Sequence, residues 1–451
     1  MSRRETEIER LRKAFDTLAH FYVLQNETSS SIVDSNAGGA ARCSAMVENP
    51  RTAIDNVSGK TDLEGCRPTW AEIDLDALAA NFRAVRQQVG AGVGMMAVVK
   101  ADAYGHGAAW CARRLSAAGA EWFGVALPEE GVELRRVGIE EPILCLEGFW
   151  NGQAELCLRE RLTPVVYRRD VAAAFDAAAR AEGVVADVHV KIDTGMNRLG
   201  VRDEDAAEFA AVMREFQSLR VDGLMTHFAA ADDAARSSFT EEQLARFQAA
   251  QSAFQSHGHQ PRFTHLANSA TVFAYPAAHG NLVRPGGVLY GLWRDVLQPS
   301  SETFFLHPVM SLRSRISHLK IVQTGETLGY GCAFAATRPT RVATLPIGYH
   351  DGYPRALSNR GRVIVRGQFA SIVGRVSMDL TLVDVTGIHG VEAGDVATLI
   401  GTDGDQSISA EELAELAGTI SYEITCGVSR RVPRISPKSN VQCPKSKDQC
   451  F

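Results

Sequence analysis

Several polar residues stand directly after short apolar runs, and one of them is a lysine able to do covalent chemistry. Lys100 ends the run that begins at Met95, and the Gly-rich stretch 101–107, ADAYGHG, follows it. An amine in apolar surroundings loses its proton more readily than in water. A neutral lysine amine can form a Schiff base with an aldehyde cofactor. One lysine carries little weight alone, so the interpretation depends on the residues that accompany it.

Other reactive side chains repeat the pattern further along the chain. Apolar runs contain or lead into Lys191, Arg198, His227, His265, Asn268, Ser269 and Arg284. Asn268-Ser269 and the pair Gly286-Gly287 offer polar side chains and backbone N–H groups, which can bind a phosphate. These groups can act together only if the runs are strands whose carboxyl ends meet.

The apolar runs alternate with helical segments such as 172–183 and 241–254. Eight runs are found, at 95–100, 123–127, 142–148, 162–167, 188–195, 221–228, 263–269 and 282–292. Eight strands alternating with helices predict a (β/α)8 TIM-type barrel, an α/β fold whose reactive groups follow the carboxyl ends of the strands. An open doubly wound sheet is the alternative. The eight units and the lack of a Gly-rich dinucleotide motif disfavour it.

The pattern changes near His307. The runs 315–323, 341–348, 361–367, 369–385 and 395–401 are β-rich and separated by Gly/Asp turns. We therefore expect the barrel over 67–306 and an all-β C-terminal domain over 307–435. The first strand of the barrel region, at about 69–75, is a candidate to pair with the β domain. We expect residues 436–451 to form a disordered tail.

Residues 1–66 read as a flexible N-terminal extension. Leu11, Phe15, Leu18 and Tyr22 share one helical face, and the Ser/Asn/Gly/Ala-rich stretch 29–41 follows as a linker. The helix could bind a partner, or the segment could be an extension without function. The sequence leaves both interpretations open.

Composition excludes several classes of partner. The net charge of -6 and the lack of a basic stripe argue against nucleic acid. No apolar run is long enough to span a membrane, and the N-terminus lacks the apolar region of a signal peptide, so we expect a cytoplasmic protein. Nine cysteines without paired spacing indicate reduced thiols. His257 and His259 have no accompanying zinc-type ligand set, so we expect no metal.

Eight blocks, in order, resemble the alanine racemase family. They are AVVKADAYGHG, VKIDTGMNRLG, MTHFAAAD, HLANSA, VRPGGVLYGL, LGYGCAF, LPIGYHDGYPR and GRVSMDLTLVDV. The likeness runs from about Pro68 to Ile435. It implies a pyridoxal-phosphate-dependent enzyme that interconverts L-alanine and D-alanine with two bases and supplies D-alanine for peptidoglycan. It also implies a head-to-tail homodimer in which the β domain of one subunit completes the site of the other.

The resemblance assigns a role to individual residues. Lys100 would carry the cofactor and act as one catalytic base, and Tyr330 of the other subunit would be the second. Tyr104, Asn268, Ser269, Gly286 and Gly287 would hold the phosphate, with His227 beside the pyridine ring and Arg198 at its hydroxyl. Arg198, Tyr349, Met378 and Asp379 would line the substrate. Lys191 matches a lysine that the family often carries as an N-carbamate, which could pair with Arg198.

Arg284 would face the pyridine nitrogen. A guanidinium keeps its protons at neutral pH, so the ring would stay unprotonated and reprotonation at Cα would be favoured over transamination. Tyr330 needs cationic or hydrogen-bonding neighbours to act as a base, because a phenol is ordinarily a weak one at neutral pH. We expect His265, next to Arg284, to contribute to such a chain.

The chain departs from the family pattern at two positions. Arg430 stands where the family commonly has a tyrosine near the substrate entrance, and His350 stands where a small residue is usual. A broad-specificity or serine-accepting racemase is therefore an alternative. A decarboxylase of the same fold would be expected to place an acid opposite the ring nitrogen. A non-catalytic single-barrel protein would lack the β domain and Tyr330.

Overall fold

The computed structural model describes residues 67–294 and 306–436. The expected helix around Leu11, the linker that follows it and the expected tail beyond Ser436 lie outside the described residues. No helix of the described ranges combines the length and apolarity that crossing a lipid bilayer requires.

A parallel sheet of eight successive strands forms the barrel, and every one of the eight expected runs contributes a strand to it. In sheet order these are β10 (Leu282–Val283), β2 (Gly94–Val98), β3 (Trp122–Val125), β4 (Ile143–Cys145), β5 (Leu162–Val166), β6 (Ala186–Asp193), β8 (Leu219–Met225) and β9 (Phe263–His265). The backbone N–H of Arg284 donates to the carbonyl of Ala267 at 2.9 Å and joins the two ends of the sheet. The short strand β7 (Val201–Arg202) pairs with β6 alone. The (β/α)8 prediction is confirmed.

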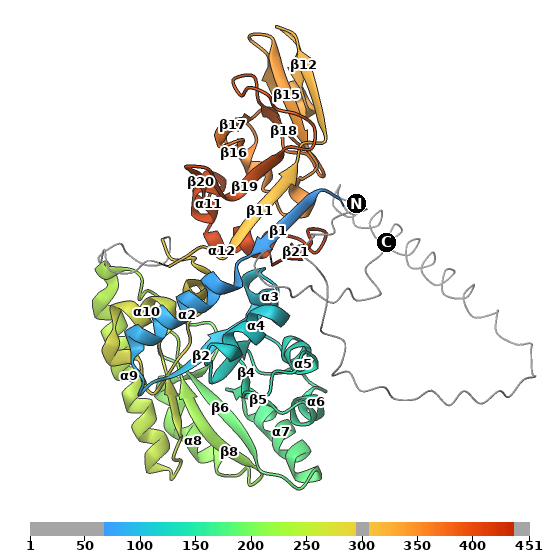
Figure 1. Ribbon diagram of the computed structural model, residues 1–451. Helices are drawn as coiled ribbons and strands as arrows, with labels where there is room; N and C mark the ends of the chain where they lie inside the picture. Colours follow the sequence, from blue (N-terminus) through green and yellow to red (C-terminus); the bar gives the residue numbers. More distant parts are fainter. Residues whose placement is uncertain (1–66, 295–305, 437–451) are drawn as a thin grey trace, which may run out of the picture. The chain divides into compact units, whose positions relative to one another are not determined.

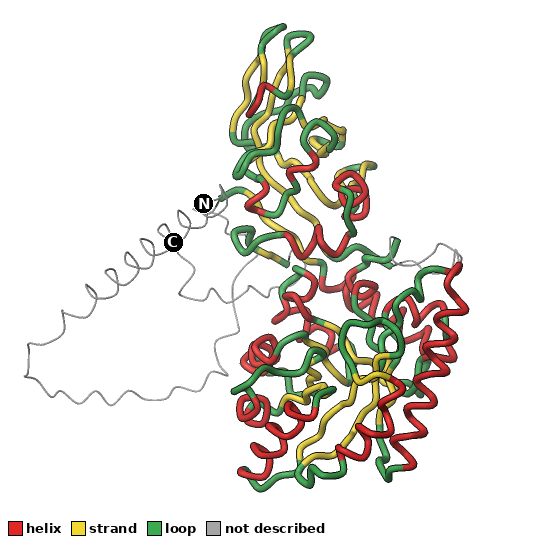
Figure 2. Tube along the Cα trace, turned by 180° about the vertical axis from the view of Figure 1, so that it is seen from behind, coloured by secondary structure: helices red, strands yellow, loops and turns green. Residues whose placement is uncertain are grey.

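Helices cover the outside of the strands (Figures 1 and 2). They are α2 (Leu75–Val89), α4 (Ala108–Ala117), α5 (Pro128–Arg136), α6 (Ala154–Arg159), α7 (Arg169–Ala181), α8 (Ala206–Met213), α9 (Ser237–Ser256) and α10 (Ser269–Ala274). Their apolar faces pack on the outward side chains of the strands, which alternate with inward ones. The inward side chains Met96, Trp122, Leu144, Val165, Met225 and Leu282 form a separate apolar cluster inside the barrel.

The N-terminal strand β1 (Thr69–Ile73) belongs to the second sheet and not to the barrel. It pairs antiparallel with β11 (Met310–Arg315), with Trp70 opposite Arg313, and parallel with β21 (Arg434–Ile435). The sheet continues through β19 (Val396–Asp403), β16 (Arg362–Val365), β17 (Gln368–Ile372), β18 (Thr381–Asp384), β15 (Thr340–Leu345) and β12 (His318–Val322). The chain thus passes through the β domain before it enters the barrel.

The C-terminal region also contains structure that the strand pattern did not indicate. Helices α11 (Ala410–Ala417) and α12 (Ser421–Gly427) follow β20 (Gln406–Ile408). The Ser409 side chain accepts a hydrogen bond from the N–H of Glu412 and caps α11, and Gly418 ends it at φ 78°. Both helices are too short for a helical repeat to be conspicuous among β-rich runs. They matter because α12 and β21 lie against the loops at the carboxyl ends of the barrel strands, as the contacts below show.

Candidate active site

The residues after Lys100 form a turn of left-handed helix. Lys100 opens the short segment α3 (Lys100–Tyr104), and the four residues from Ala101 to Tyr104 have φ between 53° and 55°. A left-handed conformation costs a residue with a Cβ about 1–2 kcal/mol, so four in succession require strong support from their surroundings. The Lys100 side chain is half-buried, less enclosed than the apolar run before it led us to expect.

Three side chains hold this turn in place. Glu130 of α5 accepts hydrogen bonds from the N–H groups of Ala101 and Ala126, both at 2.7 Å. Asp102 accepts from the N–H of Ala108 at 2.7 Å, at the start of α4. The guanidinium of Arg434 donates twice to the carbonyl of Gly105, at 3.0 and 3.1 Å. The C-terminal segment thereby fixes the loop that carries Lys100.

His106 supports the same turn from inside. Its Nδ1 lies 2.9 Å from the carbonyl of Ala103 and 3.0 Å from that of Tyr104, so this nitrogen is the protonated donor. Burial lowers the pKa of His106 to about 4, which leaves the ring neutral at physiological pH. The imidazole stacks on the Tyr290 ring at 4.7 Å.

The expected phosphate-binding groups lie close to one another. The Tyr104 hydroxyl lies so near Gly286 that a Cβ there would overlap it, and a Cβ at Gly287 would overlap the hydroxyl of Tyr422. The N–H of Gly286 donates to Oγ of Ser269 at 3.0 Å. Burial raises the pKa of Tyr104, so its hydroxyl keeps its proton and can donate to an anion.

Asn268, next to the expected phosphate-binding residues, caps a helix. Its Oδ1 accepts from the N–H and the hydroxyl of Thr271, at 3.0 and 2.9 Å, and caps α10. The carboxamide oxygen is therefore engaged in the protein, and only its NH2 group remains for a ligand.

Arg284 is buried and almost fully satisfied. Nη1 donates to Nδ1 of His265 at 3.0 Å and to the His265 carbonyl, while Nη2 donates to the carbonyls of Thr226 at 2.8 Å and Leu266 at 3.1 Å. The Nε–H has no hydrogen-bond acceptor among the described residues. Burial lowers the pKa of Arg284, but no carboxylate of the described chain pairs with it. The guanidinium is thus held rigidly with one donor left over.

Cationic and imidazole side chains surround Arg284. Burial, with Arg198 and Arg284 nearby, lowers the pKa of Lys191 to about 8. Burial and the charges of Arg284, Lys191, Arg198 and Lys100 hold the pKa of His227 well below its ordinary value. The structure therefore brings Lys100, Lys191, Arg198, His227 and Arg284 to one end of the barrel, as the strand-end argument predicted.

His265 is engaged at both of its ring nitrogens. Its ring is fully buried, Nδ1 faces Arg284, and Nε2 lies 2.8 Å from Nδ1 of His189. No ring nitrogen is left to contact a tyrosine, so His265 can contribute to the expected chain only through Arg284 and not by touching Tyr330 itself. The strand-end pattern located the residue but could not show which way its ring nitrogens point.

The second group of expected residues lies on the β domain. Tyr330, in the connection between β13 (Thr327–Leu328) and β14 (Phe334–Ala335), is 73% exposed, and Met378 is 51% exposed. Backbone hydrogen bonds tie Tyr349 to the Ser377 carbonyl and His350 to the Met378 carbonyl, both at 3.0 Å. Tyr349 and Met378 therefore lie side by side. No hydrogen bond between described residues links them, or Tyr330, to Lys100.

The structure also places Asp379 and the two residues that depart from the family pattern, Arg430 and His350. Asp379 pairs with Arg431 at 2.9 Å, and Arg67 donates to its carbonyl at 2.8 Å. Arg430 acts electrostatically on Glu133 of α5 and on Arg434, which places its charge near the Lys100 loop. His350 is exposed beside Tyr349.

Sequence reasoning did not single out Glu130, Arg434 or His189. Glu130 belongs to a Pro-Glu-Glu helix start, and Arg434 lies in the VPRI segment, so neither differs visibly from an ordinary surface residue. His189 stands in an apolar strand two residues before Lys191. The two-residue spacing, which puts both side chains on the inner face, was the one available signal.

Comparison with known proteins gives consistent results. Residues 73–293 match the family model of the alanine racemase N-terminal domain, and residues 309–436 match that of the C-terminal domain. An alanine racemase of Geobacter sulfurreducens is 45% identical over 375 residues, which cover 82% of this chain and 97% of the relative.

Solved structures agree in fold over the same region. Alanine racemase from Streptomyces coelicolor aligns with a TM-score of 0.77 and 38% identity, covering 82% of this chain and 98% of that one. Alanine racemase from Bartonella henselae with covalently bound pyridoxal phosphate aligns with a TM-score of 0.74 and 30% identity, covering 82% and 99%.

Proposed function

The chain belongs to the alanine racemase family, and from this premise we propose that it interconverts L-alanine and D-alanine with pyridoxal phosphate carried on Lys100. The observation that carries the proposal is the buried Arg284, a guanidinium with a single uncommitted N–H at the same barrel end as Lys100. A decarboxylase would be expected to have an acid at that place. We also propose that the D-alanine serves peptidoglycan synthesis.

The donor set fits pyridoxal phosphate. The Tyr104 hydroxyl, the Ser269 hydroxyl and the backbone of Gly286 and Gly287 would hold the phosphate, where a Cβ on either glycine would fill the cradle. The free Nε–H of Arg284 would donate to the ring nitrogen, and His227 and Arg198 would border the ring. When bound, the cofactor withdraws electrons from Cα of the amino acid and makes its proton removable.

The protein supplies a base for each face of Cα. The Lys100 amine would take or give the proton on one face, and the Tyr330 hydroxyl of a second copy would do so on the other. Arg284 would orient the ring without surrendering a proton, because its guanidinium remains charged at neutral pH. The guanidinium of Arg375 lies against Gly331, which follows Tyr330 in the chain, and is the cationic neighbour that the structure offers to this part of the β domain.

A head-to-tail homodimer explains why the site residues of the β domain face solvent. Tyr330, Tyr349 and Met378 are among the exposed large side chains of the described chain. Large exposed apolar and aromatic side chains are typical of interaction surfaces. We propose that this surface completes the Lys100 site of a second copy.

Subunit complementation tests this arrangement. Lys100→Ala and Tyr330→Phe homodimers should both be inactive, but a mixture should regain activity because each mixed dimer contains one site with both bases. Random exchange of a twofold dimer should restore about a quarter of wild-type activity. No recovery after exchange, with mixed dimers detected by mass, would overturn the shared site.

The reaction itself is tested with L-alanine in deuterated water. We expect D-alanine to accumulate with deuterium at Cα, and Tyr330→Phe to lose interconversion while Lys100 still exchanges the proton of one enantiomer. Carbon dioxide release, or no exchange in the wild-type protein, would contradict the proposal.

Arg430 favours a second candidate, a racemase of broader specificity. Its positive charge near Glu133 and the Lys100 loop replaces the aromatic ring of the family pattern. An entrance lined by the cationic Arg430 would admit polar amino acids such as serine more readily than an entrance lined by a tyrosine ring would. Rates with serine and alanine in the wild type and in Arg430→Tyr separate the two, since only the broader enzyme should lose serine activity on this change.

A further inference from the structure

Two imidazoles meet inside the barrel, beneath the cationic end. His189 of β6 and His265 of β9 are both fully buried, and the Nδ1 of His189 lies 2.8 Å from the Nε2 of His265. The remaining interior is apolar, as the cluster around Trp122 and Leu144 shows. Buried polar groups cost free energy unless hydrogen bonds compensate them, so a pair of apolar side chains would serve packing better.

The contact with Arg284 shows where the protons of this pair reside. Its Nη1 lies 3.0 Å from the Nδ1 of His265, and a guanidinium can only donate. The Nδ1 of His265 therefore accepts, and the single proton of the neutral ring is on Nε2. That Nε2–H donates to the Nδ1 of His189, so the proton of His189 is on its own Nε2. The tautomer of His265 is thus set by two neighbours together, the guanidinium of Arg284 that needs an acceptor at Nδ1 and the Nδ1 of His189 that accepts the Nε2–H.

Both rings are held in the neutral state that this chain of hydrogen bonds requires. Burial lowers the pKa of His189 to about 3, with Arg284 and Arg262 adding to the effect. Burial, Arg284 and His189 together keep the pKa of His265 well below its ordinary value. Neither ring gains a proton in the neutral pH range.

On the side facing away from His265, the ring of His189 is held by steric contacts and not by hydrogen bonds. Its Nε2 is buried and has no hydrogen-bond partner among the described residues. The ring lies 5.3 Å from that of Trp122 and stacks on Phe263 at 5.9 Å. On the neighbouring strand, a Cβ on Gly223 would come within 2.6 Å of the imidazole. These neighbours fix the plane of the ring, and the hydrogen bond to His265 requires that Nδ1 point toward it.

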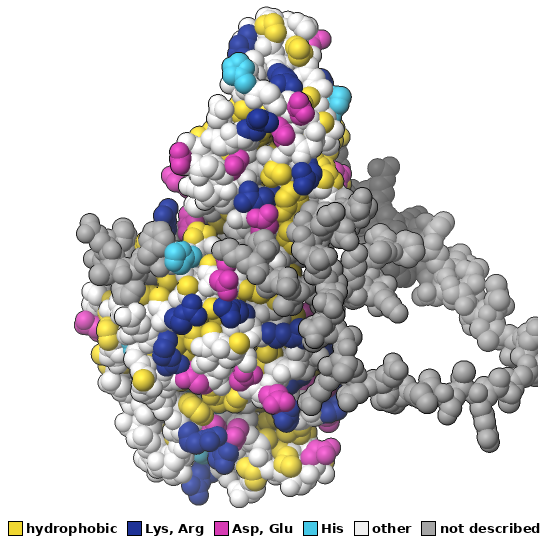
Figure 3. Space-filling model, viewed as in Figure 1, with side chains coloured by type: hydrophobic (Ala, Val, Ile, Leu, Met, Phe, Trp, Pro, Cys, Tyr) yellow, Lys and Arg dark blue, Asp and Glu magenta, His cyan; other side chains and the backbone are white. Residues whose placement is uncertain are grey.

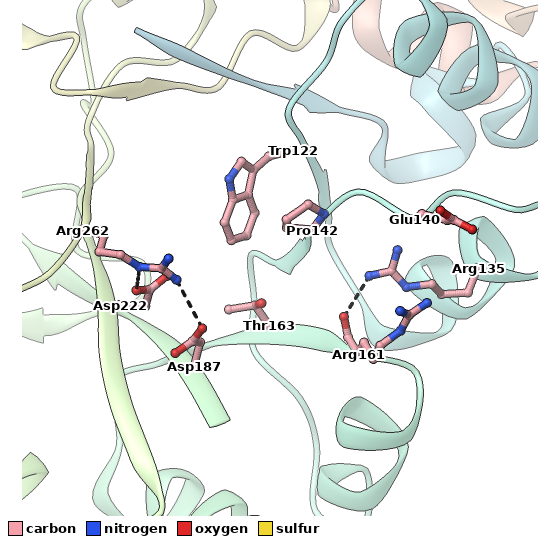
Figure 4. Close-up of a pocket in the computed structure, with 9 residues that line it drawn as sticks. All are labelled: Trp122, Arg135, Glu140, Pro142, Arg161, Thr163, Asp187, Asp222 and Arg262. Atoms are coloured by element: carbon pink, nitrogen blue, oxygen red, sulfur yellow. Dashed lines mark hydrogen bonds and ion pairs between the residues drawn. The ribbon is translucent and has the colours of Figure 1, made fainter. Parts of the chain in front are cut away.

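Trp122 supports the pair from the amino-terminal end of the barrel. It lines a cavity of about 240 Å³ between the ion pairs of Arg262 and the side chains of Arg135 and Arg161 (Figure 4). The contacts therefore run without interruption from this cavity through Trp122, His189 and His265 to Arg284.

We propose that His189 is a positioning residue of the reaction, which keeps His265 in its Nε2-protonated form and thereby holds Arg284 with its free Nε–H toward the cofactor ring. Without the acceptor on His189, His265 can move its proton to Nδ1, where an N–H would oppose the guanidinium. Arg284 would then lose one of its fixed acceptors and its alignment. The catalytic consequence rests on the proposed racemase function, whereas the tautomers do not depend on it.

Nitrogen NMR of the histidine rings tests the proposal directly. In full-length protein with ¹⁵N-labelled histidine, with and without pyridoxal phosphate, two-bond correlation spectra distinguish the two neutral tautomers. We expect His189 and His265 to be Nε2-protonated throughout the neutral pH range. Nδ1 protonation or a positive charge on His265 would overturn the inference.

Substitutions of His189 separate positioning from packing. His189→Phe should leave His265 in mixed tautomers and lower kcat on the order of tenfold with little change in KM, as for other residues that orient a catalytic group. His189→Asn places a carboxamide oxygen near the former Nδ1 and should restore both the tautomer and kcat. A His189→Phe protein with an unchanged His265 spectrum would overturn the proposal.

Two further variants cover the case in which His189→Phe does not fold. Gly223→Ala should push the imidazole away from His265 and reproduce the spectral change. Leu144→Val loosens the same apolar cluster without touching His189 and should leave the tautomer unchanged. If the tautomers are as described but the wild type does not racemise alanine, the proposed function fails and the positioning of Arg284 stands.

Discussion

The two ends of the barrel treat charge in opposite ways. At the carboxyl ends of the strands, Lys191, Arg198 and Arg284 form no ion pair with a described carboxylate, and Arg284 is held by carbonyls and an imidazole. At the amino ends, Arg262 pairs with Asp222 at 2.8 Å and Arg220 pairs with Asp187 at 2.6 Å.

This difference in pairing indicates that the amino ends of the strands contribute to stability and the carboxyl ends to ligand binding. Paired charges at the amino ends neutralise each other, so they stabilise the barrel without requiring a ligand. The buried cations Lys191 and Arg284 at the carboxyl ends destabilise the fold in isolation, and an anionic ligand would offset this cost. On the face shown in Figure 3, by contrast, acidic and basic side chains are interspersed, as expected for a solvated surface.

Replacing Lys100 should give the largest loss of racemase activity and leave the ion pairs at the amino ends of the strands unchanged. Lys100→Arg keeps a positive charge but cannot form a Schiff base, so alanine racemisation should fall at least about a thousandfold. Initial rates, cofactor retention after desalting and circular dichroism measure this. Residual activity near the wild-type level would disprove the role of Lys100.

A charge reversal at each end compares the two ends directly. Arg284→Glu should lower kcat about a hundredfold, as for the loss of an oriented donor, and should introduce transamination because an acid can protonate the ring. Arg262→Glu should reduce stability and leave kcat unchanged. Pyruvate formation and kcat are the measurements, and equal kinetic effects of the two variants would refute the comparison.

The charge of the buried Lys191, at the carboxyl ends of the strands, should make the stability of the fold depend on pH. Its pKa in the folded chain is lowered from 10.5 to about 8, so burying the charged form destabilises the fold by about 3 kcal/mol below pH 8. Stability in CO2-free buffer should rise as the pH increases from about 8 toward 10.5. Bicarbonate at neutral pH should raise the Tm as well, because N-carbamate formation removes the cation.

Lys191→Gln is the control for this effect. It should abolish both the rise with pH and the response to bicarbonate. A variant that keeps either response would show that another group is responsible.

Breaking a pair at the amino end should give the smallest effect, limited to stability. Asp222 is 1% exposed, and Asp222→Asn should lower the free energy of unfolding by about 2 kcal/mol because Arg262 loses its charged partner. Glu204→Gln, in the exposed pair with Arg202, should change it by less than about 0.5 kcal/mol. Urea unfolding measures both, and a large loss of kcat in Asp222→Asn would contradict the division between the ends.

The barrel and the position of its reactive end could be predicted because both depend on local patterns. Apolar runs of strand length specify the eight strands, and the carboxyl ends of parallel strands converge whatever the details of packing. Lys100, Lys191, His227 and Arg284 therefore had to lie at one end of the barrel. The helices α11 and α12 escaped prediction because eight or fewer residues hold too little periodicity.

The sequence by itself determined the eight strands of the barrel and the residues that follow their carboxyl ends, and it indicated that the strand at about 69–75 pairs with the β domain, since each follows from the order of residue types along the chain. Only the tertiary structure decided that Arg434 fixes the Lys100 loop and that His189 meets His265. These partners are 76 to 329 residues apart in the sequence. A sequence pattern does not show which ring nitrogen or guanidinium N–H will face which acceptor. Only the packing of the folded chain brings these atoms together.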